Sequence, residues 1–199
     1  MLSEASVAPD PFAQFAAWFQ DAVEAGEVLP EAMTVATSTR SGAPSARMVL
    51  LRGVDARGFG FFTNYDSQKG RELAENPRAA LVIYWSKLGR QVRVTGAVVR
   101  QSAEESAAYF HSRPLSSQLS AWASPQSAVI SNRGMLEDAV AAMSKKYEGT
   151  PVPLPRNWGG YRLIPQTIEF WLHRDNRLHD RIRYTRQAKG GWRIERLAP

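Results

Sequence analysis

The chain has 199 residues, of which 44% are hydrophobic, enough for one compact domain of ordinary size. Its 25 basic and 19 acidic residues give a net charge of +6, but the basic residues are scattered, so we do not expect nucleic-acid binding. No apolar run approaches the ~18–20 residues of a membrane span, and no secretion signal is recognisable at the start. We therefore expect a soluble, cytoplasmic protein without a membrane partner.

The N-terminal part is predicted to be a tail followed by a helix. Residues 1–10 are mostly small or polar and lack periodicity, which predicts a flexible tail. Asp10 and Pro11 suit the start of a helix. Apolar residues then recur at three- and four-residue spacing as far as Gly26, which indicates an amphipathic helix packed on a core.

From residue 33 the apolar period changes to two, which indicates strands. The predicted strands are 33–39, 45–52, 59–64, 79–85, 90–100, 161–164, 167–172, 181–186 and 191–197. The predicted helices after the first are 67–75, 102–111, 116–123 and 134–147. Short turns join most strands, so the expected fold is mainly β with peripheral helices: one mostly antiparallel barrel formed by residues 11–199.

Side-chain redox or metal chemistry has little support in the composition. There is no cysteine, and His111, His173 and His179 do not have the spacing of a metal site. We expect no bound metal, and any redox activity would need an organic cofactor.

A first group of residues suits a phosphate, although no glycine-rich nucleotide loop is present. Arg47 lies in an otherwise apolar strand, and Lys69 lies at the start of a short helix, where backbone amides attract anions. The alternative is that Arg47 lies at a strand edge and Lys69 is a solvated helix residue.

Two further groups carry charge at high density. Tyr109, Arg113 and Ser117 offer a phenol, a guanidinium and a hydroxyl that suit a phosphate monoester, unless Ser117 or its neighbour caps the next helix. In an extended 177–181 segment, Arg177, His179 and Arg181 would share one face. The alternative is that His179 is a surface residue paired with the aspartate that follows it.

Together these motifs resemble the pyridoxine/pyridoxamine 5′-phosphate oxidases. The resemblance runs in order over residues 33–199. It rests chiefly on Arg47-Met-Val-Leu-Leu51, Ser67-Gln-Lys69, Tyr109-Phe-His-Ser-Arg-Pro114, Gln126-Ser127, Trp158-Gly-Gly160 and Arg177-Leu-His-Asp-Arg181. It implies the FMN-binding split β-barrel and a homodimer with FMN at the subunit interface.

The resemblance also implies residue roles and a reaction. The residues matched to the FMN site are Arg47, Met48, Val49, Leu50, Leu51, Phe62, Thr63, Gln68, Lys69, Gln91, Gln126, Ser127, Trp171 and Arg181. Those matched to the substrate site are Arg52, Tyr109, Arg113, Ser117, Arg177 and His179, of which the last two are the implied catalytic residues. The implied reaction oxidises pyridoxamine or pyridoxine 5′-phosphate to pyridoxal 5′-phosphate and reduces O2 to H2O2.

The sequence departs from the family pattern in several places. Arg52 replaces the usual lysine, Leu29 replaces an acidic residue, and Leu172-His173-Arg174 replace small polar residues. Strict strand alternation would also place Arg47 and Arg52 on opposite faces, so we expect a bulge or the dimer partner to bring them into one site.

Two other functions remain as alternatives. One is an oxidase of the same fold with another substrate, as in phenazine biosynthesis, which the retained Tyr109, Arg113 and Ser117 argue against. The other is a flavin-binding protein without turnover, which the retained Arg177 and His179 argue against.

Overall fold

The computed structural model describes residues 2–199. Within these residues, strand pairing is antiparallel throughout one sheet, in the order β2-β1-β5-β6-β7-β4-β3, with β8 and β9 continuing from β7. The strands are β1 (Ala32–Ser38), β2 (Pro44–Leu50), β3 (Val54–Asp55), β4 (Gly58–Asn64), β5 (Arg78–Trp85), β6 (Arg90–Arg100), β7 (Trp158–Leu172), β8 (Asp180–Arg186) and β9 (Trp192–Arg196). The expected mainly β, mostly antiparallel split barrel is confirmed.

Helices lie around the sheet, as expected, and their caps explain where they begin. They are α1 (Pro11–Glu24), α2 (Gln68–Glu75), α3 (Ala103–Ser112), α4 (Leu115–Ala123) and α5 (Gly134–Lys146), with 3-10 turns at η1 (Ser86–Leu88) and η2 (Asp175–Arg177). Asp10 caps α1, Ser67 caps α2, and Ser102 forms a capping box with the third residue of α3. None of the helices in residues 2–199 has the length and apolar character needed to cross a membrane.

The barrel splits at one point of β7. Two strands were predicted over 161–172, but β7 is a single strand whose pairing with β6 shifts register between Thr95 and Gly96. On its other edge, β7 pairs with β4 through Trp158–Leu163 and with β8 through Thr167–Leu172. Pro165 has no backbone N–H, so it cannot donate a hydrogen bond to a neighbouring strand. The register shift of β7 lies at this residue.

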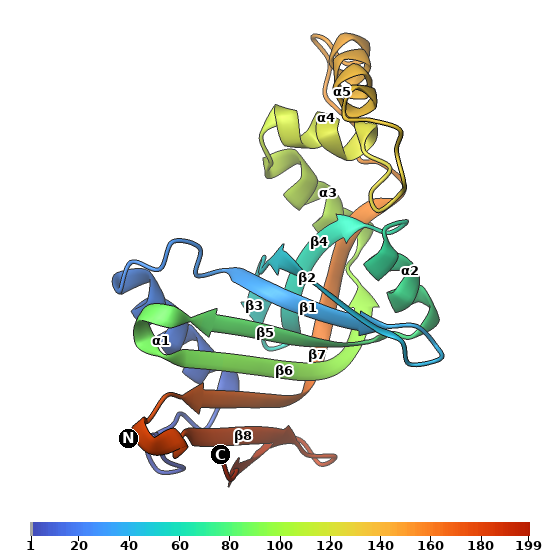
Figure 1. Cartoon of the computed structure of the whole chain (residues 1–199). Helices are drawn as coiled ribbons and strands as arrows, with labels where there is room; N and C mark the ends of the chain where they lie inside the picture. Colours follow the sequence, from blue (N-terminus) through green and yellow to red (C-terminus); the bar gives the residue numbers. More distant parts are fainter. Residues whose placement is uncertain (1) are drawn as a thin grey trace.

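The core lies between the inner face of the sheet and α1. Phe15 of α1 packs on Phe59, with ring centroids 5.1 Å apart, and on Trp85 at 5.9 Å. Trp18 packs edge-on against Phe170 at 5.2 Å. Figure 1 shows α1 behind the sheet, next to β5 and β6, so this helix covers the core on that side.

Residues 2–10 differ from the flexible tail that we expected. Leu2 and Val7 are buried, and the Leu2 backbone N–H donates to the carboxylate of Asp180 at 3.1 Å. The Tyr184 hydroxyl donates to the carbonyl of Ala8 at 2.7 Å. The segment packs because β8 supplies partners for its backbone, which a lack of periodicity cannot reveal; Met1 lies outside the described residues.

The helices α3, α4 and α5 form a second layer at one end of the sheet, and α5 lies farthest from the strands (Figure 1). A small core of Phe110, Leu119, Val152 and Trp158 joins them to the start of β7. The residues expected around phosphate groups lie at this junction.

Gly96→Ala is expected to destabilise the protein at the split. A Cβ at Gly96 would overlap the backbone carbonyl of Ile164 across the β6–β7 pair, and backbone atoms cannot move aside cheaply. We expect a loss of about 1–3 kcal/mol in the free energy of unfolding, measured by urea denaturation. Gly134→Ala, where the added Cβ would meet only the side chain of Asn132, is the control and should change stability little.

Candidate functional site

A cavity of about 280 Å³ lies between β2, β4 and α3. It is lined by Met48, Val49, Leu50, Arg52, Phe62, Thr63, Lys69, Tyr109, Arg113, Gln126 and Trp158, which we call the cavity group. All of them except Trp158 were expected at the flavin or the substrate. Ligand pockets usually have about 300–1,000 Å³, so this cavity is small for a nucleotide cofactor together with a substrate.

Arg52 reaches the cavity because β2 ends before it. The strand was predicted to continue to residue 52, but it ends at Leu50. The Arg52 backbone N–H then donates to the carbonyl of Gly60 at 2.7 Å, and Gly53 turns the chain with a φ of 95°. Strand alternation therefore stops before Arg52, and neither a bulge in β2 nor a partner subunit is needed to explain its position.

Lys69 is buried at the wall of the cavity. Its Nζ donates to the amide oxygen of Gln126 at 2.9 Å and to the hydroxyl of Thr63 at 3.0 Å. Burial, aided by the charge of Arg47, lowers the pKa of Lys69 to about 8. At neutral pH the side chain is thus a desolvated cation that gains from an anion beside it, which rules out the alternative of a solvated lysine.

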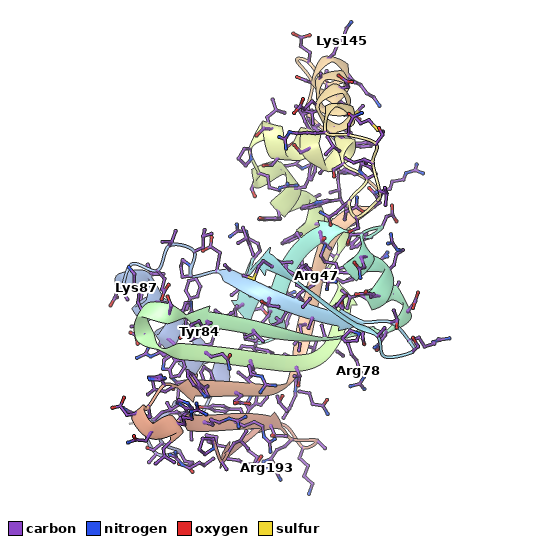
Figure 2. The ribbon with its side chains drawn as sticks, viewed as in Figure 1. Arg47, Arg78, Tyr84, Lys87, Lys145 and Arg193 are labelled. Atoms are coloured by element: carbon purple, nitrogen blue, oxygen red, sulfur yellow. The ribbon has the colours of Figure 1, made fainter. Side chains whose placement is uncertain are left out.

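Arg47 lies beside this lysine but is not part of the cavity lining. Its Nη1 donates to the hydroxyl of Thr37 at 2.6 Å, and its Nη2 lies 3.4 Å from the carboxylate of Glu72. Figure 2 shows Arg47 in the middle of the molecule beside β1, whereas Lys145 and Arg193 lie at opposite ends. Sequence reasoning did not identify Glu72, which is buried on α2.

Arg113 and Tyr109 provide a second cationic corner of the cavity. The Arg113 guanidinium lies 4.8 Å from the ring centre of Trp158, and burial lowers its pKa. Its Nη1 is buried and has no hydrogen-bond partner among residues 2–199. A buried donor without a partner costs free energy, so this atom favours an anionic ligand. The phenol of Tyr109 accepts a hydrogen bond from Nε of Arg52 at 2.8 Å.

Several expected residues lie outside the cavity lining. Ser117 is within the first turn of α4, whose N-cap is Pro114, so the alternative that Ser117 or its neighbour caps this helix is wrong.

Leu29, which stands where the family has an acidic residue, is 57% exposed. The carboxylate near Arg52 belongs to Glu31, and it lies 3.4 Å from Nη1 of Arg52. The others outside the lining are Leu51, Gln68 and Ser127. Trp158 belongs to a matched motif but was given no role at a site, and Glu31 belongs to none of the quoted motifs; only the fold shows that Trp158 lines the cavity and that Glu31 lies beside Arg52.

A second group of expected residues lies on β6, β7, β8 and the turn before β8. Gln91, Trp171 and Arg181 are in register across the three strands and therefore share a face of the sheet. Nε of Arg181 donates to Glu169 at 2.8 Å, and the ring of His179 lies 4.6 Å from that of Trp171. Gln91, Trp171, Arg177, His179 and Arg181 are called the sheet group below.

The segment 177–181 is not extended, so the condition under which Arg177, His179 and Arg181 would share one face is not met. Arg177 ends the turn η2 with a φ of 61° and is exposed, and β8 begins only at Asp180. The proposed pairing of His179 with Asp180 is also absent within residues 2–199. The carboxylate of Asp180 binds Arg174 at 2.9 Å and Arg196 at 3.1 Å, while Nδ1 of His179 accepts the backbone N–H of Arg174 at 3.1 Å.

One chain does not bring the two groups together. Trp158 of the cavity group begins β7, and Trp171 of the sheet group lies near its end. At about 3.3 Å per residue, the strand separates them by roughly 40 Å along its length. A site that uses both groups therefore needs two copies of the chain.

Comparison with known proteins finds two family matches that together span most of the chain. Residues 19–147 match the pyridoxamine 5′-phosphate oxidase family, and residues 158–199 match the C-terminal dimerisation region of pyridoxine 5′-phosphate oxidase. The chain is 56% identical over 200 residues to the pyridoxine/pyridoxamine 5′-phosphate oxidase of Burkholderia cenocepacia (strain HI2424), covering 100% of this chain and 93% of that protein. The enzyme of the same name from Burkholderia thailandensis is also 56% identical over the same shares.

Two solved structures share the fold. PhzG from Burkholderia lata 383, in complex with tetrahydrophenazine-1-carboxylic acid, has a TM-score of 0.93 at 31% identity and covers 100% of this chain and 98% of its own. A pyridoxamine 5′-phosphate oxidase-related, FMN-binding protein from Nostoc punctiforme has a TM-score of 0.76 at 19% identity, covering 96% and 98%. The fold is a split barrel, and the family that the chain matches is of the oxidoreductase type. The chain belongs to the pyridoxine/pyridoxamine 5′-phosphate oxidase family, and the matched dimerisation region supports a homodimer.

Lys69→Met is expected to change how stability depends on pH. The pKa of Lys69 is about 8 in the folded protein and about 10.4 in an unfolded chain, so between these values the unfolded state binds more protons. The free energy of unfolding then rises with pH through Lys69, by at most about 1.4 kcal/mol per unit. Urea unfolding at pH 7.5 and 9.5 should show a smaller rise in Lys69→Met than in the wild type, and an equal rise would contradict the assignment.

The exposed Lys145 on α5 provides the matched control. Lys145→Met removes the same charge without touching the cavity, so it separates loss of one positive charge from loss of the buried amine.

Proposed function

We propose that this protein oxidises pyridoxamine 5′-phosphate and pyridoxine 5′-phosphate to pyridoxal 5′-phosphate with FMN as cofactor, reducing O2 to H2O2. The observation that carries the proposal is that two separate cationic corners, one at Lys69 and one at Arg113, share one cavity. Such a pair suits a phosphorylated cofactor and a phosphorylated substrate held side by side. The name of the 56% identical Burkholderia relative agrees with this activity.

The donors near Lys69 fit the cofactor. The Lys69 ammonium and the Arg47 guanidinium would hold the FMN phosphate by charge-assisted hydrogen bonds, with Gln126 and Thr63 beside them. Bound FMN would supply the hydride acceptor and the route of electrons to O2. Side chains of the protein would bind the substrate, orient it and move protons.

The corner at Arg113 fits the substrate phosphate. Arg113 brings a buried N–H that has no partner among the described residues 2–199, and Tyr109 and Arg52 add a phenol and a second guanidinium. A phosphate held in this corner would anchor the substrate away from its reacting carbon. The binding energy can then fix the orientation of the substrate's pyridine ring. The stacked rings of Phe62 and Tyr109, 4.0 Å apart, form an apolar wall that excludes water.

The sheet group would complete the site from a second subunit. The dimerisation match begins at residue 158 and includes Trp171, Arg177, His179 and Arg181. In the partner, the exposed guanidinium of Arg177 would orient the substrate and stabilise negative charge on it. Because Nδ1 of His179 accepts a backbone N–H, the neutral ring carries its proton on Nε2, where it can position the substrate or relay a proton.

A second candidate follows from the structural match to PhzG. That protein was solved with tetrahydrophenazine-1-carboxylic acid and has a TM-score of 0.93 to this chain, so a phosphate-free tricyclic acid is the alternative substrate class. The buried Nη1 of the half-buried Arg113 and the phenol of Tyr109 favour the phosphate monoester.

The deciding measurement is the visible spectrum of the FMN-reconstituted protein under anaerobic conditions. Addition of pyridoxamine 5′-phosphate should bleach the flavin band, and admission of air should restore it with formation of H2O2. Bleaching by tetrahydrophenazine-1-carboxylic acid, but not by pyridoxamine 5′-phosphate, would favour the second candidate. No FMN uptake would refute both.

Two arginine variants should separate cofactor binding from catalysis. Arg177→Ala should keep FMN bound and lose most of kcat, about 10²-fold or more, because it removes charge stabilisation of the reacting substrate. Arg47→Ala should raise the Kd of FMN instead, by roughly ten-fold, since it removes a charge-assisted bond to the phosphate. Fluorescence titration and steady-state assays distinguish the two effects, and the reverse pattern would overturn the assigned roles.

A further inference from the structure

A carboxylate lies inside the cationic site proposed for the FMN phosphate. Glu72, on α2, is 6% exposed and lies one turn after Lys69. Its Oε2 accepts the hydroxyl of Ser45 at 2.6 Å and the hydroxyl of Thr37, and it lies 3.4 Å from Nη2 of Arg47. Its Oε1 accepts the side-chain amide of Gln68 at 2.9 Å. A negative group so placed is unexpected where a phosphate dianion is to bind.

The two hydroxyls join Glu72 to Arg47. Each of them accepts an N–H of the guanidinium and donates its O–H to the carboxylate, so Thr37 and Ser45 are both fully oriented. Nη1 also donates to the carbonyl of Val35 at 3.3 Å. Both terminal nitrogens of Arg47 are therefore held by protein acceptors, which fixes the guanidinium but also occupies its donors.

The carboxylate is charged throughout the neutral range. Burial alone would raise the pKa of Glu72, but hydrogen bonds from Ser45, Thr37 and Gln68 and the charge of Arg47 outweigh it and lower the pKa to about 2. The site thus contains two cations, Arg47 and Lys69, and one anion. A phosphate entering it gains from one net positive charge instead of two.

We propose that Glu72 is a positioning residue and an internal counter-anion of the FMN-phosphate site, which holds Arg47 in place and at the same time weakens cofactor binding. The inference rests on the proposed FMN function. In the absence of FMN, Glu72 offsets the buried Lys69 and the half-buried Arg47, two cations that would otherwise repel each other. In its presence, Glu72 competes with the phosphate for the donors of Arg47 and repels the phosphate across a poorly screened interior.

Glu72→Gln tests the proposal because the amide keeps an oxygen for the two hydroxyls and removes the charge. FMN binding to flavin-free, full-length protein, measured at pH 7 by quenching of flavin fluorescence, should tighten by roughly three- to thirty-fold. Riboflavin lacks the phosphate, so its Kd should change less than about two-fold. Glu75→Gln, which removes an exposed carboxylate from the same helix, should alter neither Kd.

The outcomes separate this proposal from the proposed function. Wild-type protein that does not prefer FMN over riboflavin would refute the phosphate site itself, and with it the role of Glu72. If the wild type does prefer FMN but Glu72→Gln binds FMN no tighter, or tightens FMN and riboflavin equally, only the role of Glu72 is refuted.

A second variant covers the case in which Glu72→Gln does not fold. Ser45→Ala keeps the carboxylate and removes one bridging hydroxyl, so Arg47 loses part of its support while the negative charge remains. It should weaken FMN binding by roughly three-fold or more and leave riboflavin binding unchanged. Unchanged FMN binding in Ser45→Ala would contradict the positioning role.

Discussion

The strand β7 is hydrogen-bonded to β6 along one edge and to β4 and β8 in succession along the other, and the positions of the other elements follow from this pairing. A regular strand has one neighbour on each edge. The register shift opposite Gly96, next to Pro165, lets the second edge change partners within a few residues. The sheet therefore divides into a part that carries the helices and a part that carries β8 and β9, and α1 covers the core between them.

The same pairing separates the functional residues. The cavity group gathers at the start of β7, where α2 and α3 approach the sheet, and the sheet group lies near its end. Neither the cavity group nor the sheet group alone contains all the side chains that the proposed reaction needs. The cavity lining has cations for two phosphates but includes neither Arg177 nor His179, which belong to the sheet group. Dimerisation is thus a requirement of the proposed active site and not only a source of stability.

Buried charge is the feature that distinguishes the cavity from the rest of the surface. Lys69 and Arg113 both have lowered pKa values because burial disfavours their charged forms. The protein retains these desolvated cations at a cost in stability, and the nearby carboxylates pair with the neighbouring arginines, Glu72 with Arg47 and Glu31 with Arg52. Ligand phosphates bound beside these cations would regain part of that free energy.

The sequence alone determined the mainly β class, the helix starts and most of the cavity residues, because capping, period-two alternation and ordered motifs depend on local chemistry. Tertiary structure decided the rest. Local patterns predicted two strands where β7 is one, a flexible tail where Leu2 and Val7 are buried, and a strand that reaches Arg52 where β2 ends at Leu50. Glu72 and Glu31 belong to none of the quoted motifs, and the motif that contains Trp158 did not reveal its place in the cavity, since these roles come from neighbours far away in the chain. Only the folded arrangement could show these contacts, because packing and charge pairing depend on distances in space that the order of residues does not contain.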